Sequence, residues 1–433
     1  MAVAVLEAML MPYIAAGRLI IKRQHKPVAV EMAGDRILAV ALESSEGEKL
    51  WLRADYVLDA SELGEVLELS HTEHVIGAES QQDSGELHAP AKANPLDQQA
   101  INWCYALDYR PGEDHRIAKP ENYDFWQSYQ ADFWAGKLLS WHDINPITLK
   151  KRHLALFDSD LRSPKGEKLH LWNYRRILCK DNFIQGTFAS DISLVNWPQM
   201  DYWLGPLLGV SPEAQQAHLK AAKELSLALL YWMQHEAPRH DSQNNKKQSS
   251  HKQGYPELRL RADVFETQDG LAKAPYIRES RRILPLFRVT EAHLGVEQRG
   301  QLKGAELFED SVGIGSYRID LHPSTALKSY LDISSYPFQI PLGALIPQRM
   351  ENLLPAAKNI GVTHITNGCY RLHPVEWNIG EVAGALAAYC LKHHKLPREI
   401  YQKKSLLRHF QEMLVRDFDI ELSWPDYARF YPC

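Results

Sequence analysis

The sequence predicts a mixed α/β fold of the α+β kind, in which a large aromatic-rich segment is inserted into a discontinuous domain. The first observation is an apolar strand, Leu50–Ser61, that ends in Asp59 and Ala60; open α/β sheets place ligands at such carboxyl ends of strands. The second is a strand, loop and helix between Asn352 and Cys390. The third is the density of Trp, Tyr and Phe after residue 65, which implies burial. We therefore expect residues 1–64 and 330–395 to form one domain, 65–329 a substrate or cap domain, and 396–433 a helical tail.

Other elements follow from periodicity. Apolar spacing predicts a helix over Ala4–Ile14, a long helix over Pro212–His235 and an amphipathic helix after Leu396. Polar, low-complexity residues predict a mobile surface loop over 237–254. Strands are expected at these segments: Arg18–Arg23, Val28–Met32, Arg36–Glu43, Leu50–Ser61, Asp310–His322 and Phe338–Gly343.

The stretch from Asn352 to Cys390 is expected to be a short strand, then a loop that holds Asn359, Gly361, Asn367 and Gly368, then a helix. Pro374 suits the first turn of that helix, because the N–H that proline lacks has no partner within the helix. The stripe Gly380, Gly384 and Ala388 suggests that a backbone or a flat ligand packs closely. The helix N-terminus suits an anionic group.

Composition excludes several classes of protein. A net charge of −5 gives no reason to expect nucleic acid or an anionic membrane surface, and no apolar run has the length of a membrane span. Five scattered cysteines without a CxxC give no support for zinc or an iron–sulfur cluster, and the reducing cytoplasm is the expected location. His71 with His74, and His393 with His394, have no third ligand nearby, so no metal is expected. No nucleophile elbow, P-loop or HExxH occurs, which argues against hydrolases and NTPases.

Three blocks resemble the FAD-dependent oxidoreductases of the glutathione-reductase-like superfamily. They are Ala54–Ser61 (ADYVLDAS), Arg278–Arg282 (RESRR) followed by Tyr317 and Ile319–His322 (IDLH), and the stretch Asn352–Cys390. The likeness spans nearly the whole chain. It implies an FAD cofactor and redox chemistry on a small molecule.

The resemblance also implies which residues approach the cofactor. The last strand, loop and helix of this superfamily contact FAD, and the strand that ends in Asp-Ala lies near it. The candidate cofactor-binding residues are therefore Asp59, Ala60, Asn359, Ile360, Gly361, Arg371, His373, Pro374, Val375 and Glu376. Pro374, Val375 and Glu376 would place helix N–H groups at the flavin ring, where they would stabilise the negative charge of a reduced flavin.

The chain departs from the superfamily in its dinucleotide fingerprint. A βαβ unit with GxGxxG should precede everything described above, yet no GxGxxG occurs in the 433 residues. Gly313-Ile314-Gly315 is only a GxG. We therefore expect a Rossmann-like FAD-binding domain that is incomplete, in a chain that begins after its fingerprint.

Five residues are candidates for catalysis. Arg278 and Arg281 could clamp a carboxylate-bearing substrate, since guanidinium groups form bidentate contacts. Tyr317, Asp320 and His322 could relay the proton that accompanies a hydride transfer, and strand alternation puts the last two on one face. The alternative is structural: Arg278 could pair within a charge network, and a histidine before a proline is often structural. His364 and His373 are further candidates.

The first hypothesis is an FAD-dependent oxidoreductase that transfers a hydride between an unidentified small organic substrate and flavin. It involves no nucleic acid and no membrane, and it leaves homo-oligomer formation open. The alternative is a non-catalytic pseudoenzyme or binding protein that keeps the fold without the cofactor. A weaker third hypothesis is a carbohydrate-binding or glycoside-processing protein that uses the many Trp residues and carboxylates.

Overall fold

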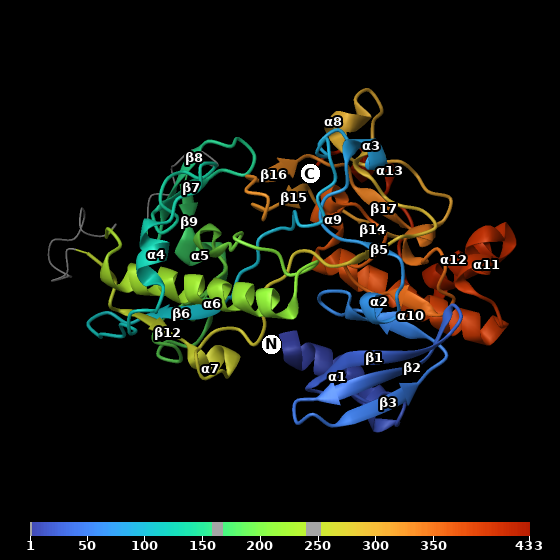
Figure 1. Ribbon diagram of the computed structural model, residues 1–433, viewed down its shortest axis with the longest axis horizontal. Helices are drawn as coiled ribbons and strands as arrows, with labels where there is room; N and C mark the ends of the chain where they lie inside the picture. Colours follow the sequence, from blue (N-terminus) through green and yellow to red (C-terminus); the bar gives the residue numbers. More distant parts are fainter. Residues whose placement is uncertain (1, 158–167, 240–252) are drawn as a thin grey trace.

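The computed structural model describes residues 2–157, 168–239 and 253–433, and every structural statement below concerns these residues. Two lobes lie side by side in Figure 1, one built around helix α6 (Pro212–His235) and the other around helix α10 (His373–His393). The mixture of helices with several small sheets agrees with the predicted mixed α/β class.

The α6 lobe packs helices against a four-stranded sheet of order β10-β11-β6-β12. Helix α6 starts after Ser211, whose side chain accepts a hydrogen bond from the N–H of Ala214, and it has the predicted bounds. Its apolar face enters a core rich in tryptophan, as aromatic density predicted. The remaining elements of this lobe are β6 (Tyr105–Tyr109), α4 (Tyr123–Ser128), β7 (His142–Ile144), β8 (Lys151–Ala155), β9 (Lys168–His170), α5 (Leu171–Tyr174), β10 (Arg176–Leu178), β11 (Ile192–Val195), β12 (Leu258–Leu260) and α7 (Ala262–Phe265).

The α10 lobe packs helices on short paired strands, with β14 antiparallel to β17 and β15 antiparallel to β16. Its hydrophobic core runs from Val289 to Ile420 and includes the buried face of α10. The elements are α8 (Val296–Arg299), β14 (Ser311–Gly315), β15 (Ile319–Leu321), β16 (Leu331–Ile333), β17 (Phe338–Pro341), α9 (His364–Tyr370), α11 (Pro397–Gln402), α12 (Lys404–Phe418) and α13 (Asp426–Arg429).

The N-terminal part forms an antiparallel sheet of order β1-β2-β3 below the α10 lobe in Figure 1. A small core joins this sheet to helix α2. The elements are α1 (Ala2–Ala15), β1 (His25–Ala33), β2 (Arg36–Ser44), β3 (Lys49–Arg53), β4 (Val57–Asp59) and α2 (Glu65–Leu69). The chain then passes through β5 (His74–Val75), which pairs with β13 (Arg282–Ile283), to α3 (Gln81–Ser84), which lies beside α8 at the top of the α10 lobe in Figure 1.

One parallel strand pair joins the two ends of the chain. β4 pairs in parallel with β18 (Leu353–Pro355), so that Asp59 lies opposite Pro355 at the carboxyl end of both strands. Asn352 fixes this arrangement, because its buried side chain accepts from the N–H of Ile37 and donates to the carbonyls of Ile37 and Asp55, all at 2.9 Å. The predicted proximity of the strand end at Asp59 and the stretch after Asn352 is therefore observed.

Several predicted elements are wrong in detail. Arg18–Arg23 forms no strand, and Ile20 is 75% exposed, because no neighbouring strand completes its backbone hydrogen bonds. The strand expected over Leu50–Ser61 is two strands, β3 and β4, that join different sheets. The strand expected over Asp310–His322 is likewise divided into β14 and β15.

Two further predictions concern loops. Asn367 and Gly368 lie in helix α9 and not in a loop, because the Thr363 side chain accepts a hydrogen bond from the Thr366 N–H and caps this helix. The loop predicted over 237–254 lies mostly outside the described residues, which resume at 253.

Hydrophobic packing groups the chain differently from the expected domain limits. Val289, Leu294 and Val312 belong to the predicted cap segment, but they share the core of α10. The tail shares this core as well, through Phe410 and Leu414 of α12. The core of the α6 lobe is drawn almost wholly from residues 100–271, with Tyr330 added.

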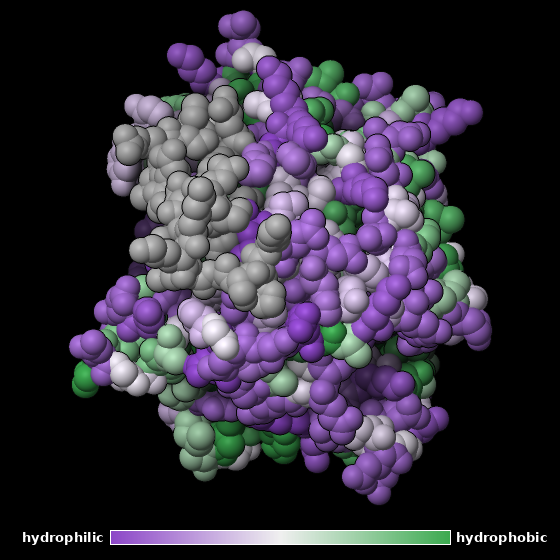
Figure 2. Space-filling view, turned by 90° about the vertical axis from the view of Figure 1, so that its left-hand side faces the viewer, coloured by the Kyte–Doolittle hydropathy of each residue, from purple (hydrophilic) through white to green (hydrophobic). Residues whose placement is uncertain are grey.

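The molecular surface differs between regions. The face on the side of the α6 lobe is largely hydrophilic, and apolar side chains gather mainly at its lower edge (Figure 2). Within the described residues, no helix combines the length and the apolar composition that crossing a bilayer requires. Helix α1 is apolar but exposed along its described length, with Val3, Met11 and Tyr13 each more than half exposed.

Candidate active site

A buried carboxylate, Asp201, gathers polar side chains from three distant parts of the chain. The Nδ1 atom of His322, just after β15, lies 2.7 Å from Asp201 Oδ2. The other oxygen, Oδ1, lies 3.0 Å from Nη2 of Arg278 and accepts a hydrogen bond of 2.9 Å from Asn102 Nδ2. Tertiary folding thus brings together two of the predicted catalytic residues, Arg278 and His322, through an aspartate that lies between them.

Electrostatics keeps Asp201 ionised. Burial raises the pKa of its carboxyl group, but the charges of Arg278 and His322 outweigh burial and hold that pKa below its usual value. An ionised Asp201 fixes the proton of the His322 ring on Nδ1, so Nε2 is the atom left for other partners.

Arg278 lies behind Asp201, at a buried position. Its Nη1 donates to the Ala100 carbonyl at 2.5 Å, and its guanidinium group lies 5.1 Å from the ring centre of Tyr276. Arg278 is only 2% exposed, and its positive charge balances the negative charge of the buried Asp201. This geometry is that of a positioning residue.

Asp320 and Arg371 extend the cluster toward helix α10. Arg371 Nη2 donates to the Asp320 carbonyl oxygen at 2.9 Å, and it lies 3.7 Å from the Asp320 carboxylate. That carboxylate lies 3.9 Å from Nε2 of His322, as strand alternation predicted for the two side chains. Arg371 precedes α10 by two residues, so it links the Asp201 cluster to the helix N-terminus.

Two cavities meet at His322 and Tyr330, which line both of them. The smaller cavity, of about 170 Å³, contains Tyr317, Asp320 and His322 in its wall. Arg152 and Tyr174 of the α6 lobe complete that wall, so this cavity lies between the lobes. Burial first, and then the charge of Asp320, raise the pKa of Tyr317, whose hydroxyl therefore keeps its proton at neutral pH.

Arg281 lies apart from the Asp201 cluster. Its Nη1 donates to the Leu63 carbonyl at 3.0 Å, and its Nη2 pairs with Glu68. Arg281 therefore holds the loop that follows β4. The structure does not bring it to His322.

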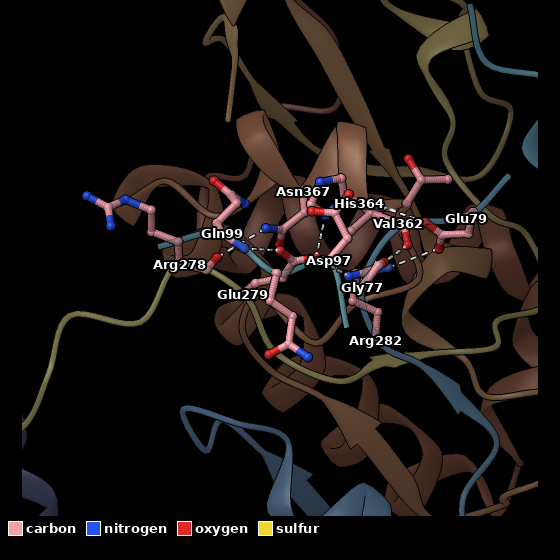
Figure 3. A network of polar contacts seen from close by, with 12 residues as sticks. Gly77, Glu79, Asp97, Gln99, Arg278, Glu279, Arg282, Val362, His364 and Asn367 are labelled. Carbon is pink, nitrogen blue, oxygen red and sulfur yellow. Dashed lines mark hydrogen bonds and ion pairs between the residues drawn. The ribbon is translucent and has the colours of Figure 1, made fainter. Parts of the chain in front are cut away.

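Arg282 is the centre of a second buried network, shown in Figure 3. It pairs with Glu279 at 2.7 Å and with Glu79 at 3.0 Å, and it donates to the carbonyls of Gly77 and Val362. Glu279 Oε1 also forms a hydrogen bond of 2.7 Å with Nδ1 of His364. Burial raises the pKa of Glu279, but His364 and Arg282 lower it to about 2.

The carboxyl ends of β4 and β18 carry the first group of predicted cofactor-binding residues. Asp59 is buried, and its Oδ1 accepts from the Ser61 N–H at 2.9 Å while Oδ2 has no partner among the described residues. Burial raises the pKa of this carboxyl group. Asn359 Nδ2 donates to the Asp59 carbonyl at 2.8 Å, which holds the two strand-end loops together.

The loop after β18 approaches other parts of the chain closely. Gly361 has no room for a side chain, since a Cβ there would lie 2.2 Å from Pro285 Cγ. Ile360 is fully buried, and Ala60 lies exposed in the loop opposite. Lys358 of this loop pairs with Glu62 of the loop after β4.

The N-terminus of α10 carries the second group of predicted cofactor-binding residues. Leu372 precedes the helix and supplies no side-chain cap, while His373 and Pro374 are exposed and Val375 is buried. Glu376 Oε1 is buried without a partner among the described residues, and burial raises the pKa of this carboxyl group. The stripe predicted to pack closely does so at one end only. A Cβ at Gly380 would lie 3.3 Å from the Ala356 carbonyl oxygen, whereas Gly384 is exposed and a Cβ there would meet nothing within 4 Å.

Comparison with known proteins identifies the family. The model of the FAD dependent oxidoreductase family matches residues 1–414, nearly the whole chain. The chain belongs to the FAD dependent oxidoreductase family. This membership implies FAD as the cofactor and a flavin redox function. No curated protein and no solved structure matches the chain.

In this FAD dependent oxidoreductase, the residues at the end of β4 and at the N-terminus of α10 fit an FAD cofactor. Asp59 Oδ2 is a buried acceptor that lacks a donor, and a hydroxyl group of a bound cofactor would supply one. The α10 N-terminus has no side-chain cap, so its first N–H groups can meet negative charge. The GxGxxG unit that would contact the pyrophosphate does not occur in the 433 residues.

Sequence reasoning missed several members of the site. They are Asp201, Asn102, Tyr276, Tyr330 and His88. One signal was available for Asp201, which stands in the aromatic run Asn196–Trp203. A carboxylate among residues destined for burial needs a charged partner, and is a candidate functional group on that ground. In the described parts of the chain, no three His, Cys, Asp or Glu side chains are arranged to hold a metal ion.

Proposed function

We propose that the protein transfers a hydride between a small organic substrate and FAD, with the Asp201–His322 pair as its acid–base group. The observation that carries the proposal is the 2.7 Å contact between His322 Nδ1 and Asp201 Oδ2, because His322 lines two cavities. Bound FAD supplies the hydride donor or acceptor, and the accompanying proton requires a protein group.

Each residue of the cluster has a distinct role. His322 takes a proton from the substrate, or gives one to it, at Nε2. Asp201 orients the ring and stabilises its protonated form, and Arg278 keeps Asp201 ionised. Arg371 restrains Asp320, whose carboxylate faces His322 Nε2 from the other side. Tyr317 borders the same cavity and can donate a hydrogen bond to the substrate.

The strand ends and the α10 N-terminus would hold FAD. Asp59, Ala60, Asn359, Ile360 and Gly361 form the two adjoining loops that suit the ribitol and pyrophosphate region. In the segment His373 to Glu376, the N–H groups of His373 and Val375 suit the flavin ring, while Pro374 has no N–H and Glu376 donates its own to the Leu372 carbonyl. Arg371 connects this segment to the acid–base pair.

The two lobes divide these tasks. The α10 lobe together with the β4–β18 pair acts as a Rossmann-like FAD-binding part, and the α6 lobe acts as an aromatic-rich cap over the substrate. Support comes from the separate hydrophobic cores of the lobes and from Arg152 and Tyr174, which reach the cavity from the cap.

A spectrum and a reduction assay test this function. The purified chain should retain flavin after gel filtration, with absorption bands at about 375 and 450 nm in roughly stoichiometric amount. Anaerobic mixing with small hydroxy acids, alcohols and amines should bleach the bands with at least one compound. His322→Asn should slow that bleaching by about 10²–10⁴-fold with an unchanged flavin content.

His394→Asn is the matched control. His394 has a left-handed backbone at the end of α10, a position that asparagine accepts, and it lies outside the Asp201 cluster. This variant should bleach at the wild-type rate. A colourless protein that added FAD does not stabilise against heat would contradict the proposal for this chain, and so would unchanged bleaching in His322→Asn.

A further inference from the structure

We propose that the larger cavity beside His322 binds a carboxylate group, so that the substrate is an organic acid; this inference rests on the proposed function. The cavity measures about 280 Å³ and is bounded by the segment at His88, the chain from Leu321 to Leu331, and the start of α9. It shares His322 and Tyr330 with the smaller cavity.

The basic and acidic side chains in the wall of this cavity are all of the basic type. Three histidines and one lysine line it, and no Asp or Glu does. The balancing carboxylates lie behind the wall. The four pairs are His88 Nδ1 with Glu291 Oε1 at 2.6 Å, His322 Nδ1 with Asp201 Oδ2 at 2.7 Å, His364 Nδ1 with Glu279 Oε1 at 2.7 Å, and Lys328 with Asp97.

This arrangement leaves one ring nitrogen of each histidine available for a ligand. All four carboxylates are buried, and each histidine is bonded through Nδ1, so Nε2 is the ring nitrogen that remains. Burial lowers the pKa of His364, but Glu279 more than offsets that effect and raises it. A protonated His364 presents an N–H donor at Nε2.

Two carboxylates lie near these nitrogens, but at distances longer than a good hydrogen bond. Glu297, which is exposed, lies 3.5 Å from His88 Nε2, and Asp320 lies 3.9 Å from His322 Nε2. Neither distance is that of a good hydrogen bond. Both ring nitrogens can therefore bond to a ligand that enters the cavity.

Two hydroxyl groups in the wall also lack partners. The Oγ atoms of Ser324 and Ser329 are buried and make no hydrogen bond with any described residue. Buried hydroxyl groups without partners are uncommon in folded proteins, because each lost hydrogen bond destabilises the fold. A carboxylate offers two oxygens with about four acceptor positions, which would satisfy both serines together with Lys328.

The rest of the wall suits a carbon skeleton. Pro90, Leu321, Leu331 and Ile365 supply an apolar surface beside the polar groups. The wall contains no arginine, the residue that most often binds phosphate bidentately. An organic acid therefore fits better than an inorganic anion. Because His322 belongs to this wall, the acid group would lie next to the proposed acid–base pair.

Direct binding tests the pocket without any need for turnover. Calorimetric titration of the full chain at constant ionic strength would use acetate, succinate and benzoate, each beside its neutral amide, and inorganic phosphate. At least one carboxylate should bind with one site per chain, and its amide should bind at least about tenfold more weakly. Failure of all three acids to bind, or equal binding of phosphate, would overturn the assignment.

Variants locate the binding site. Two variants, Lys328→Met and the double variant Ser324→Ala, Ser329→Ala, should each lower the affinity for the acid by about tenfold. Lys404→Met is the control, because Lys404 forms an exposed ion pair with Glu309 and neither residue lines the cavity, so it should leave binding unchanged. Carboxylate binding that neither pocket variant weakens would place the acid elsewhere and overturn the proposal.

The two proposals fail in different ways. If an acid binds and the pocket variants weaken it while His322→Asn still bleaches normally, the pocket stands and the acid–base role falls. If bleaching depends on His322 and no acid binds, the proposed function stands and the substrate class is wrong.

Discussion

Asp201 Oδ2 and His322 Nδ1 lie 2.7 Å apart although 121 residues separate them in the chain. The aspartate comes from the aromatic lobe, directly after the 3-10 helix Pro198–Met200, and the histidine directly follows β15 in the other lobe. Their contact therefore joins the two lobes at the wall of both cavities. A change in the docking of the lobes would change the orientation of the imidazole ring, so the packing of the lobes would affect the proton transfer that we propose for His322.

Removal of the charge at Asp201 should damage both stability and catalysis. Asp201→Asn leaves the Arg278 guanidinium buried without its balancing carboxylate, which should lower the free energy of unfolding by about 3–5 kcal/mol. Urea denaturation measures this loss. Asp124→Asn, which removes only an exposed pair with Lys119, should change stability by less than about 1 kcal/mol.

Arg282 should be far more important to folding than a surface arginine. Arg282→Met leaves Glu79 and Glu279 buried and unpaired, and we expect a loss of about 3–5 kcal/mol in the free energy of unfolding. Arg53→Met breaks an exposed pair with Glu31 and should cost less than about 1 kcal/mol. Equal urea midpoints for the two variants would contradict the view that the Arg282 network holds the loops around α9.

Glu86 should make the protein less stable as pH rises. Burial raises the pKa of Glu86 from 4.5 to about 7 in the folded chain. Its contribution is complete below pH 4.5, where both states are protonated, and is lost as pH rises through about 7, since the unfolded chain ionises first. Glu86→Gln mimics the protonated form and should be more stable than wild type by about 3 kcal/mol above pH 7, with no gain at pH 4. Urea midpoints across this range measure the difference, and a difference independent of pH would refute the assignment.

Two glycines should respond in opposite ways to alanine. Gly361→Ala places a Cβ 2.2 Å from Pro285 Cγ, and the rearrangement should destabilise the fold by about 1–3 kcal/mol. Gly384→Ala meets nothing within 4 Å inside a helix and should stabilise it by about 1 kcal/mol. Thermal denaturation of both variants gives the comparison. Destabilisation by Gly384→Ala would mean that another surface packs on the Gly380–Ala388 stripe in solution.

Local patterns were sufficient where a segment carries its own boundary signals. Pro212–His235 has a serine cap, a proline in the first turn and a continuous apolar face, and it forms the predicted helix. The strands expected over Val28–Met32 and Arg36–Glu43 likewise form, as parts of β1 and β2. Arg18–Arg23 has strand-like residues but no neighbour, and such a segment cannot become a strand on composition alone. The divided strands at Leu50–Ser61 and Asp310–His322 show the same limit, because sheet membership depends on partners far away in the chain.

The sequence by itself determined the mixed α/β class, the principal helices, the proximity of the Asp59 strand end to the Asn352–Cys390 stretch, and the family to which the chain belongs. These properties follow from short-range periodicity, from turn and cap residues, and from motifs of consecutive residues. Only the tertiary structure decided that Arg278 stands behind Asp201, that Arg281 turns to the loop at Leu63, and that His88, His322 and His364 line one cavity. The reason is physical: a buried charge must find a partner, and which partner it finds depends on the packing of the two lobes.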